Sequence, residues 1–236
     1  MDAVLLATDV RTRAEAHGLD VGRIDAAIAL AAWAHREQRR RRRGDFPSTS
    51  YIEHPLRNAA RVLRWGVTGE AVVIACLLHD TVEDHAFEIA EAFGAEVASD
   101  EASARAPVLA FYAAEFGERT ATLVAAMSNP LEGDESDDEQ QKHRVYRDHV
   151  TTAIADPDVA ICKLADLSDN ALSLHHADAH GDDPRTARLA RKYAPLLPLL
   201  LERLEGADVR ALMSDAGHRR AVAALTDGIE RLAKLV

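Results

Sequence analysis

The sequence predicts an all-α protein, and three observations support this prediction. Apolar residues recur at three- and four-residue steps through most of the chain, as they do on one face of a helix. Aromatic residues make up only 5% of the sequence, and alanine and leucine dominate it, which favours helices over strands. The one β-branched apolar run, AVVIACLLH over residues 71–79, has no second strand pattern to pair with.

Roughly ten helices in a helical bundle follow from this periodicity. In the first, over residues 21–38, Ile24, Ile28 and His35 recur on one face. Pro55 suits a first helical position, and the helix that it begins is expected to stop at Gly66. Residues 71–79 are apolar nearly all round and should form a central buried helix. The remaining helices are expected over residues 87–93, 102–116, 119–127, 139–154, 159–174, 184–204 and 209–235.

We expect one domain over residues 1–236, because no shift in composition marks a linker that could divide the chain. Two polar segments interrupt the helical pattern. Residues 132–139 hold six acids in eight positions and are expected to form a solvated loop. Residues 178–184 should form a turn between two helices.

The charge and the apolar content of the chain limit which partners and which cellular compartment are expected. The formal net charge is −11, which on average repels nucleic acid and anionic membranes, so neither is expected as a partner. No apolar run approaches the roughly 20 residues that cross a bilayer, and the start of the chain has an early acid and no basic leader. Cys76 and Cys162 lie in apolar stretches and should pack as reduced core residues. The expected compartment is the cytoplasm.

One basic segment departs from this acidic average. Residues 36–43 read REQRRRRR, with six arginines in eight positions. Such a segment attracts anions locally, and on an acidic protein it suits a small phosphorylated ligand better than a long polyanion. Some of the six arginines are expected simply to face solvent.

The densest group of ionisable residues follows the buried apolar run. His79, Asp80, Glu83 and Asp84 lie within six residues, directly after residues 71–78. Burying acidic side chains at the end of a buried helix costs folding free energy unless a positive charge compensates them. A divalent cation would compensate them, and both His79 and Asp80 can reach one ion at a helix end.

Further ligands would have to come from distant parts of the chain. His54 stands directly before Pro55, where a helix is expected to begin. Asp166 follows a largely apolar stretch, and Asn170, four residues on, shares its helix face, which Lys163 borders. Two imidazoles and two carboxylates make a mixed site that suits Mn²⁺, Fe²⁺ or Zn²⁺ and leaves positions open for water and substrate.

Three sequence blocks together resemble a known family. They are AAWAHREQRRRRRGDFPSTSYIEHPLRNAARVL, ACLLHDTVED and ICKLADLSDN. The His-Asp pair after an apolar helix is similar to the HD superfamily of metal-dependent phosphohydrolases. The three blocks, in this order over residues 26–204, look like the hydrolase domain of the RelA/SpoT alarmone family, especially its stand-alone small hydrolases. Residues 205–236 would then be a C-terminal helical extension.

The resemblance implies a helical HD fold, Mn²⁺ as the usual metal, and removal of the 3′-pyrophosphate from (p)ppGpp, giving GDP or GTP and pyrophosphate. It also implies roles for residues at matching positions. The implied metal ligands are His54, His79, Asp80 and Asp166. The implied acids that position and activate water are Glu83 and Asp84. The implied substrate-binding residues are Arg40, Arg41 and Asn170, to which Lys163 is added as their neighbour.

The chain departs from the family pattern between two Phe-Gly pairs. Phe93-Gly94 resembles the FG turn of the family, yet Phe116-Gly117 fits it better, because residues 119–127 follow it as the expected helix. We therefore expect a helical insertion over about residues 94–116, roughly the length of one helix with its loop.

Several alternatives stay open from the sequence. The chain could act on another nucleotide, such as an adenine alarmone or NADPH, or bind an alarmone as a sensor without turnover. The ligand set could be a hydrogen-bonded core cluster, and Glu83 and Asp84 could lie on a solvated turn. The oligomeric state is also open, a homo-oligomer included. Other notable side chains are expected to lie at the surface (His175, His176 and His180), to be structural (His35) or to pack in the core (Trp33 and Trp65).

Overall fold

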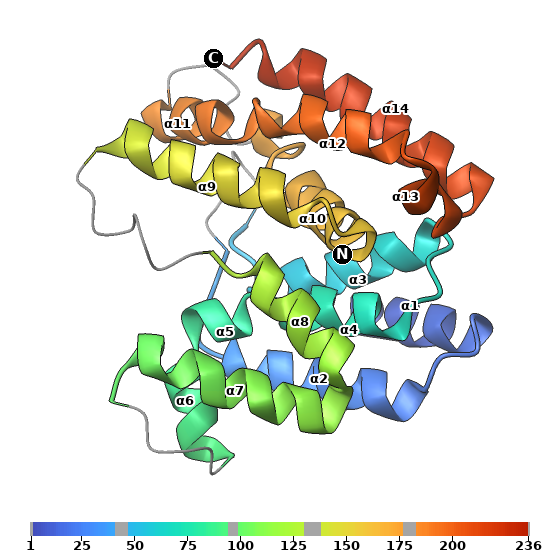
Figure 1. The fold of residues 1–236 in the computed structure, drawn as a ribbon, viewed down its shortest axis with the longest axis vertical. Helices are drawn as coiled ribbons and strands as arrows, with labels where there is room; N and C mark the ends of the chain where they lie inside the picture. Colours follow the sequence, from blue (N-terminus) through green and yellow to red (C-terminus); the bar gives the residue numbers. More distant parts are fainter. Residues whose placement is uncertain (1, 41–46, 94–98, 130–137, 177–182, 236) are drawn as a thin grey trace. The chain divides into compact units, whose positions relative to one another are not determined.

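The protein is all-α in the computed structural model, as the sequence predicts (Figure 1). The structure describes residues 2–40, 47–93, 99–129, 138–176 and 183–235. These residues form fourteen α-helices and one 3-10 helix, and the β-type pairing among them is a single isolated bridge between Arg39 and Ser50. None of the described helices has the length and apolar character that a membrane crossing requires.

The chain divides into two compact units. The first comprises Met1–Arg39, Ser50–Arg64 and Thr68–Asn129, and the second comprises Arg40–Thr49, Trp65–Val67 and Pro130–Val236. The single domain expected over residues 1–236 stays a prediction.

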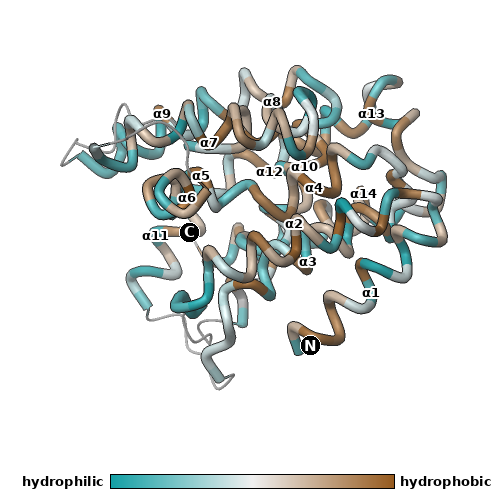
Figure 2. The backbone as a smooth tube through the Cα atoms, turned by 90° about the horizontal axis from the view of Figure 1, so that it is seen from below, coloured by the Kyte–Doolittle hydropathy of each residue, from teal (hydrophilic) through white to brown (hydrophobic). Residues whose placement is uncertain are grey.

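In the first unit, a buried central helix is covered by longer amphipathic ones. The helices are α1 (Ala3–Ala16), α2 (Val21–Ala34), α3 (Glu53–Arg64), α4 (Glu70–Leu78), α5 (Thr81–Asp84), α6 (Ala86–Ala92), α7 (Glu101–Phe116) and α8 (Glu118–Met127). Helix α4 contacts α2, α3 and α8, and its residues from Val72 to Leu78 are buried. Its tube is correspondingly hydrophobic (Figure 2). Burial on every side explains why this segment lacks an amphipathic pattern.

The second unit is built around α10, which carries several of the predicted site residues. Its elements are α9 (Glu139–Ala153), α10 (Pro157–Asn170), η1 (Leu174–His176), α11 (Pro184–Tyr193), α12 (Leu196–Leu204), α13 (Ala207–Ala211) and α14 (Asp215–Leu232). Helix α10 begins with the Asp156 side chain accepting a hydrogen bond from the backbone of Asp158, and Pro157 occupies its first turn. It contacts α9, α12 and α13.

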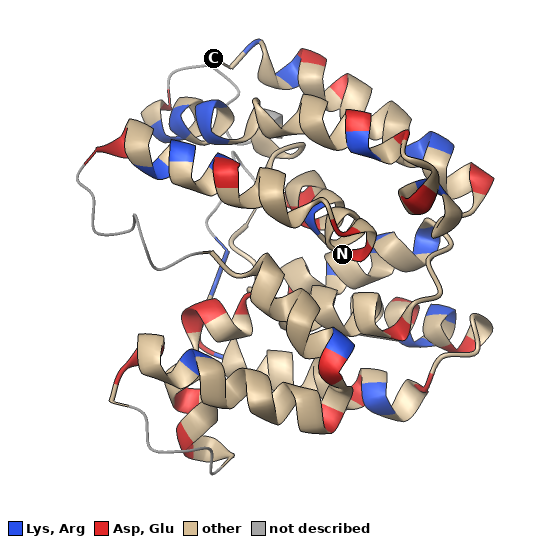
Figure 3. Cartoon of the chain, in the orientation of Figure 1, with Lys and Arg blue, Asp and Glu red and all other residues tan. Residues whose placement is uncertain are grey.

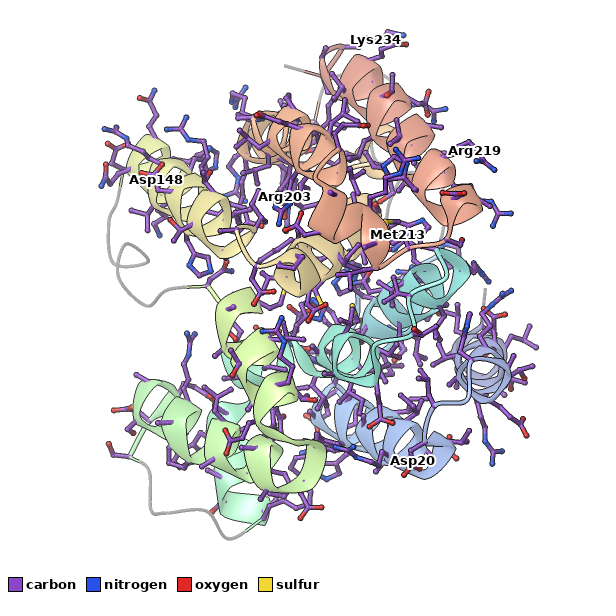
Figure 4. All side chains as sticks on the ribbon, turned by 45° about the vertical axis from the view of Figure 1, so that its right-hand side comes forward. Asp20, Asp148, Arg203, Met213, Arg219 and Lys234 are labelled. Carbon is purple, nitrogen blue, oxygen red and sulfur yellow. The ribbon has the colours of Figure 1, made fainter. Side chains whose placement is uncertain are left out.

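A single arginine holds the turn that leads into α10. Arg203 of α12 (labelled in Figure 4) donates to the backbone carbonyls of Ile154 at 2.8 Å and Ala155 at 3.1 Å, just after α9 ends. Its guanidinium also pairs with Asp208 of α13, and this contact holds the pKa of the Asp208 carboxyl well below its usual range. The arginine therefore satisfies helix-end carbonyls that would otherwise lack partners.

Basic residues in the second unit are not confined to the arginine-rich segment. Figure 3 shows them gathered on α11, where Arg185, Arg188, Arg191 and Lys192 lie. The Lys192 Nζ stands 4.0 Å from the centre of the Tyr146 ring on α9, a cation–π contact between two helices.

A close backbone approach joins the start of α14 to residues 65–67. The carbonyl of Trp65 accepts hydrogen bonds from the Ser214 backbone at 2.9 Å and the Ser214 hydroxyl at 3.1 Å. Gly217 lies against the same carbonyl, and a Cβ there would stand 1.9 Å from the Trp65 oxygen. No real Cβ contact is that short, so the residue at 217 must be glycine for this packing.

We expect Gly217→Ala to lower the free energy of unfolding by about 3 kcal/mol, because backbone atoms of residue 65 would have to move. The same change at Gly22 of α2 is the control, since a Cβ there meets only the flexible Asp20 carboxylate at 3.2 Å. Urea unfolding measures both variants. Equal stability of Gly217→Ala and wild type would contradict the packing.

Each of the ten predicted helices has a counterpart in the structure. There are four differences, and two of them have a local physical reason. Residues 184–204 and 209–235 were each expected as one helix, but each divides in two, at residues 194–195 and 212–214. Pro195 explains the first division because it cannot donate within a helix, and the N-cap Ser214 explains the second. Helix α1 and the four-residue α5 are additional. The exact end of each helix shifts by a few residues, as helix ends do.

Two further expectations on side-chain burial differ in outcome. Trp65 is buried, as expected. Trp33 is only half-buried, because it lies at the edge of α2, where its ring meets the exposed Phe93 edge to face at 5.7 Å and the Arg36 guanidinium at 4.8 Å. Cys76 and Cys162 are buried as reduced cysteines, as expected. The acidic segment 132–137 and His180 lie outside the described residues, as do residues 94–98 of the expected insertion.

Candidate metal centre

A two-residue turn, His79 and Asp80, joins the buried α4 to α5. The Thr81 hydroxyl donates to the Leu78 carbonyl at 2.6 Å and lies 2.6 Å from the Tyr112 hydroxyl of α7. Because the Leu78 carbonyl takes the Thr81 proton, the Tyr112 hydroxyl is the donor to Thr81. Tyr112 is fully buried, and burial raises its pKa. Helix α7, which falls within the expected insertion, thus holds the turn in place.

Three predicted ligands converge in the first unit. The ligand atoms of His54, His79 and Asp80 lie within 4.8 Å of one another. The two Asp80 oxygens face different imidazoles, with Oδ1 at 3.2 Å from His79 Nε2 and Oδ2 at 3.5 Å from His54 Nε2. Both histidines are buried, and the Asp80 side chain is 17% exposed. This geometry can hold one divalent cation between two nitrogens and a carboxylate.

The tautomer of His79 supports this interpretation. Its Nδ1 lies 3.1 Å from the Cys76 carbonyl, which can only accept, so Nδ1 carries the proton. In the neutral ring, Nε2 is then an acceptor that faces a carboxylate oxygen. Two acceptors at this distance repel each other unless a proton or a metal ion lies between them, which is the usual arrangement of a metal-ligating histidine.

Two neighbours orient these side chains. The Tyr51 hydroxyl donates to Asp80 Oδ2 at 2.8 Å. Asn58, one turn after His54 on α3, places its amide nitrogen 3.4 Å from His54 Nε2, and Arg61 in turn donates to Asn58 Oδ1 at 3.0 Å. Such outer contacts set the direction in which a ligand atom points.

Glu83 lies one turn after His79 and Asp80 and is clamped by one residue. Its Oε2 accepts from the Asn129 backbone at 3.1 Å, and its Oε1 accepts from the Asn129 side-chain amide. Asn129 follows the end of α8, whose last residue is Met127. The carboxylate is therefore held in one orientation by both of its oxygens. A solvated turn, the alternative for Glu83, does not describe this geometry.

Asp84 lies in a different environment. Its Oδ2 accepts from the Gln38 amide at 3.1 Å. Burial, and secondly the negative charge of Asp80, raise the pKa of Asp84. Burial also lowers the pKa of the neighbouring His35 to about 4, so this ring is neutral near pH 7. Asp84 is thus more readily protonated than an ordinary aspartate, which distinguishes it from the clamped Glu83.

The second unit contains the other predicted site residues on α10 and beside it. Asn170 donates to Asp166 Oδ1 at 2.7 Å, and the Arg40 guanidinium donates to Asn170 Oδ1 at 2.6 Å. Arg40 also lies 3.5 Å from Asp169 Oδ2. The expected Asp166–Asn170 pairing on one helix face is present, and Arg40 joins it. The guanidinium, the Asn170 amide and the two carboxylates form one hydrogen-bonded network.

The remaining substrate-binding predictions differ in what the structure describes. Lys163 is buried on α10, and its Nζ lies 5.8 Å from the centre of the Tyr146 ring. Arg41 lies outside the described residues. The roles of all ten site residues, as ligands, acids or substrate contacts, stay predictions.

Sequence reasoning missed four residues that position the others: Gln38, Tyr51, Asn58 and Asn129. A local signal existed for two of them, because Gln38 lies three residues after His35, and Asn58 lies four residues after His54. Tyr51 contacts Asp80, 29 residues away, and the sequence gives no signal for that contact. Asn129 is 46 residues from Glu83 and has no signal in the sequence.

Comparison with known proteins agrees with this fold. Residues 27–99, which include His54, His79 and Asp80, match the family described as an HD domain. A solved structure, described as a metazoan ortholog of SpoT that hydrolyses ppGpp, aligns over 91% of this chain and 97% of its own, with a TM-score of 0.56 and 20% identity. The chain therefore shares its helical fold with that protein, and its residues 27–99 are similar to an HD domain.

The sequence is also similar to proteins named guanosine-3′,5′-bis(diphosphate) 3′-pyrophosphohydrolases. MESH1 of Xenopus tropicalis is 48% identical over 64 residues, and human MESH1 is 41% identical over 85 residues. The Aquifex aeolicus enzyme of this name is 30% identical over 151 residues. These matches cover 25%, 34% and 64% of this chain, and 35%, 45% and 18% of the respective relatives.

Proposed function

We propose that the protein is a metal-dependent hydrolase of guanosine alarmones that removes the 3′-pyrophosphate of (p)ppGpp. The observation that carries this proposal is the convergence of His54, His79 and Asp80 beside the clamped carboxylate of Glu83. The names of the relatives support the choice of substrate. The reaction consumes one water and yields GDP from ppGpp, or GTP from pppGpp, with pyrophosphate.

The proposed metal is one divalent ion, Mn²⁺, with Fe²⁺ or Zn²⁺ as alternatives that the same donors accept. The residues that would hold it are His54, His79 and Asp80, with Asp166 as the fourth ligand on the resemblance of its sequence block. A bound divalent ion supplies Lewis-acid polarisation of a phosphoryl oxygen and lowers the pKa of water.

The chain itself would supply the proton acceptor. Glu83 is proposed to take the proton of the attacking water, because Asn129 holds its carboxylate in one orientation. The water oxygen adds to the phosphorus bonded to the ribose, the bond from phosphorus to the 3′ oxygen breaks, and that oxygen leaves with a proton. Asp84, whose pKa is raised, is proposed to assist as a proton donor or by orienting the water.

Arg40, Arg41, Asn170 and Lys163 are proposed to bind the nucleotide. Arginine suits the phosphates because its planar fork donates two parallel hydrogen bonds to an oxyanion. The Arg40 guanidinium is already held by Asn170 and Asp169, so it is oriented before a ligand arrives. We place this activity in the cytoplasm, in the degradation of alarmones of the stringent response, with neither nucleic acid nor membrane as a partner.

The test is release of pyrophosphate from ppGpp by Mn²⁺-loaded protein. An adenine alarmone and NADPH are compared at equal concentration. We expect the highest kcat/KM for ppGpp and no turnover after removal of the metal with a chelator. A higher kcat/KM for NADPH or the adenine alarmone would overturn the guanine assignment. Tight binding of ppGpp in Mn²⁺ without any product would overturn catalysis and indicate a sensor.

A further inference from the structure

A second group of ligand-type side chains lies in the first unit, beside the proposed metal centre. The ligand atoms of His35, Asp84 and His85 also lie within 4.8 Å of one another. His35 follows the end of α2, Asp84 ends α5, and His85 lies between α5 and α6. We call these three residues the second cluster. None of its members belongs to the His54, His79 and Asp80 set.

The hydrogen bonds around Gln38 determine which nitrogen of His35 is available. An ionised Asp84 can only accept, so the nitrogen of the Gln38 amide must face it, at 3.1 Å. The Gln38 oxygen then faces His35 Nδ1 at 2.6 Å, which makes Nδ1–H the donor. His35 Nε2 therefore carries a lone pair. Gln38 orients two members of the second cluster at once.

That lone pair is buried and has no hydrogen-bond partner among the described residues. His35 is fully buried, with an exposed fraction of 0%. A buried acceptor without a donor is costly, and native proteins rarely leave one unless a water or an ion satisfies it. Because the His35 ring is neutral, its Nε2 carries a lone pair that still needs a hydrogen-bond donor or a metal ion.

His85 repeats the pattern. Its Nδ1 lies 3.4 Å from Glu88 Oε2, and its Nε2 also has no hydrogen-bond partner among the described residues. The His35 and His85 rings meet edge to face, with centroids 5.1 Å apart. Both imidazoles thus have Nδ1 directed to an oxygen and Nε2 left over, which is how metal-ligating histidines are held by their outer neighbours.

We propose that His35, Asp84 and His85 bind a second divalent transition-metal ion. Two imidazole nitrogens and one carboxylate suit Zn²⁺, Mn²⁺ or Fe²⁺. Gln38 and Glu88 act as positioning residues for the two imidazoles. The ring of Tyr51 stands between the two sites, at 4.7 Å from the His35 ring and 5.8 Å from the His54 ring. This proposal concerns ion binding and does not depend on the proposed hydrolysis. If Asp84 binds the second ion, its part in the hydrolysis is to orient the water, since a metal-bound carboxylate donates no proton.

The experiment counts Zn²⁺ ions by equilibrium dialysis and metal analysis of the full chain. We expect two ions in the wild type and one in His85→Ala. We also expect one ion in His54→Ala and none in the variant that carries both His54→Ala and His85→Ala. His85 is the suitable imidazole because its side chain is 16% exposed, so its loss disturbs the core less than the loss of the fully buried His35. Circular dichroism verifies that each variant is helical.

A matched control is His143→Ala. His143 on α9 is also partly buried, with 23% of its side chain exposed, and pairs with a glutamate, Glu139, at 3.8 Å. Among the residues that the structure describes, it belongs to no such cluster. Two ions are expected in this variant. Gln38→Ala provides a second measurement, because losing the positioning amide should weaken the second ion about 10- to 100-fold.

The outcomes separate this proposal from the first. If His85→Ala binds as many ions as the wild type, the proposal that the second cluster binds an ion is wrong. A wild type that binds one ion, lost in His54→Ala, also overturns it. One ion that persists in His54→Ala but disappears in His85→Ala supports the second site and contradicts the metal centre of the proposed hydrolase.

Discussion

Replacing Asp80 by alanine is expected to reduce pyrophosphate release from ppGpp at least a thousandfold. Asp80 is the residue that both predicted imidazole ligands face, at 3.2 Å and 3.5 Å. Without it, the proposed ligand set loses the carboxylate that faces both imidazole nitrogens. Metal assistance contributes several kcal/mol to phosphoryl transfer, and about 4 kcal/mol corresponds to a thousandfold in rate. The initial rate in Mn²⁺ measures the loss, and metal analysis after dialysis should show the first ion gone.

Asp9→Ala is the control for removing a partly buried aspartate from the same unit. Asp9 on α1 pairs with Arg13 at 2.9 Å and with Arg64 at 2.8 Å. Its carboxylate is held by these two arginines and belongs to neither group of ligand-type side chains found among the described residues. Its rate and metal content should equal those of the wild type. An Asp80→Ala protein that keeps the wild-type rate would show that the metal centre proposed here plays no part in the reaction.

Glu83→Gln is expected to slow the reaction by about 10² to 10⁴ while leaving the metal content unchanged, because it removes a general base and no ligand. The amide keeps the shape of the carboxylate but cannot take a proton from water. It also offers one acceptor oxygen where Asn129 presents two donors, so one of these hydrogen bonds is lost. The effect should fall on kcat rather than KM, which single-turnover kinetics can separate.

The matched control is Glu70→Gln in α4. Glu70 accepts from the Asp20 backbone at 3.1 Å and from Arg23 at 2.5 Å, so it too is a carboxylate held by one backbone and one side-chain donor. Its replacement should cost stability without changing the rate. If Glu83→Gln and Glu70→Gln lower the rate equally, the loss reflects stability, and Glu83 is not the base.

The helix that lies within the expected insertion connects fold and chemistry. Tyr112 of α7 contacts Thr81, the residue that follows the predicted ligand Asp80. Helix α7 also packs against α5, α6 and α8. An inserted element that supports the turn after Asp80 would contribute to the site without supplying a ligand.

Much of the fold and part of the candidate site could be read from residue order. The helical period, the proline at the start of α10 and the burial of α4 depend on neighbours within a few residues, where local sterics and amphipathic spacing dominate. The His79–Asp80 pair was recognisable because acids after an apolar run need compensation. Asp166 and Asn170 were recognisable as one helix face because four residues make about one turn.

The contacts that orient these groups could not be read in this way. Asn129 reaches Glu83 across 46 residues, Tyr112 reaches Thr81 across 31, and Gln38 reaches Asp84 across 46. Helical periodicity says which face of a helix is buried but not which neighbour that face meets. The residue order along the chain therefore established the helices and the types of side chain available for a metal. Packing of distant helices determined which carboxylate is clamped, which imidazole nitrogen is left over, and where glycine is required, because these depend on contacts between helices and not on spacing within one.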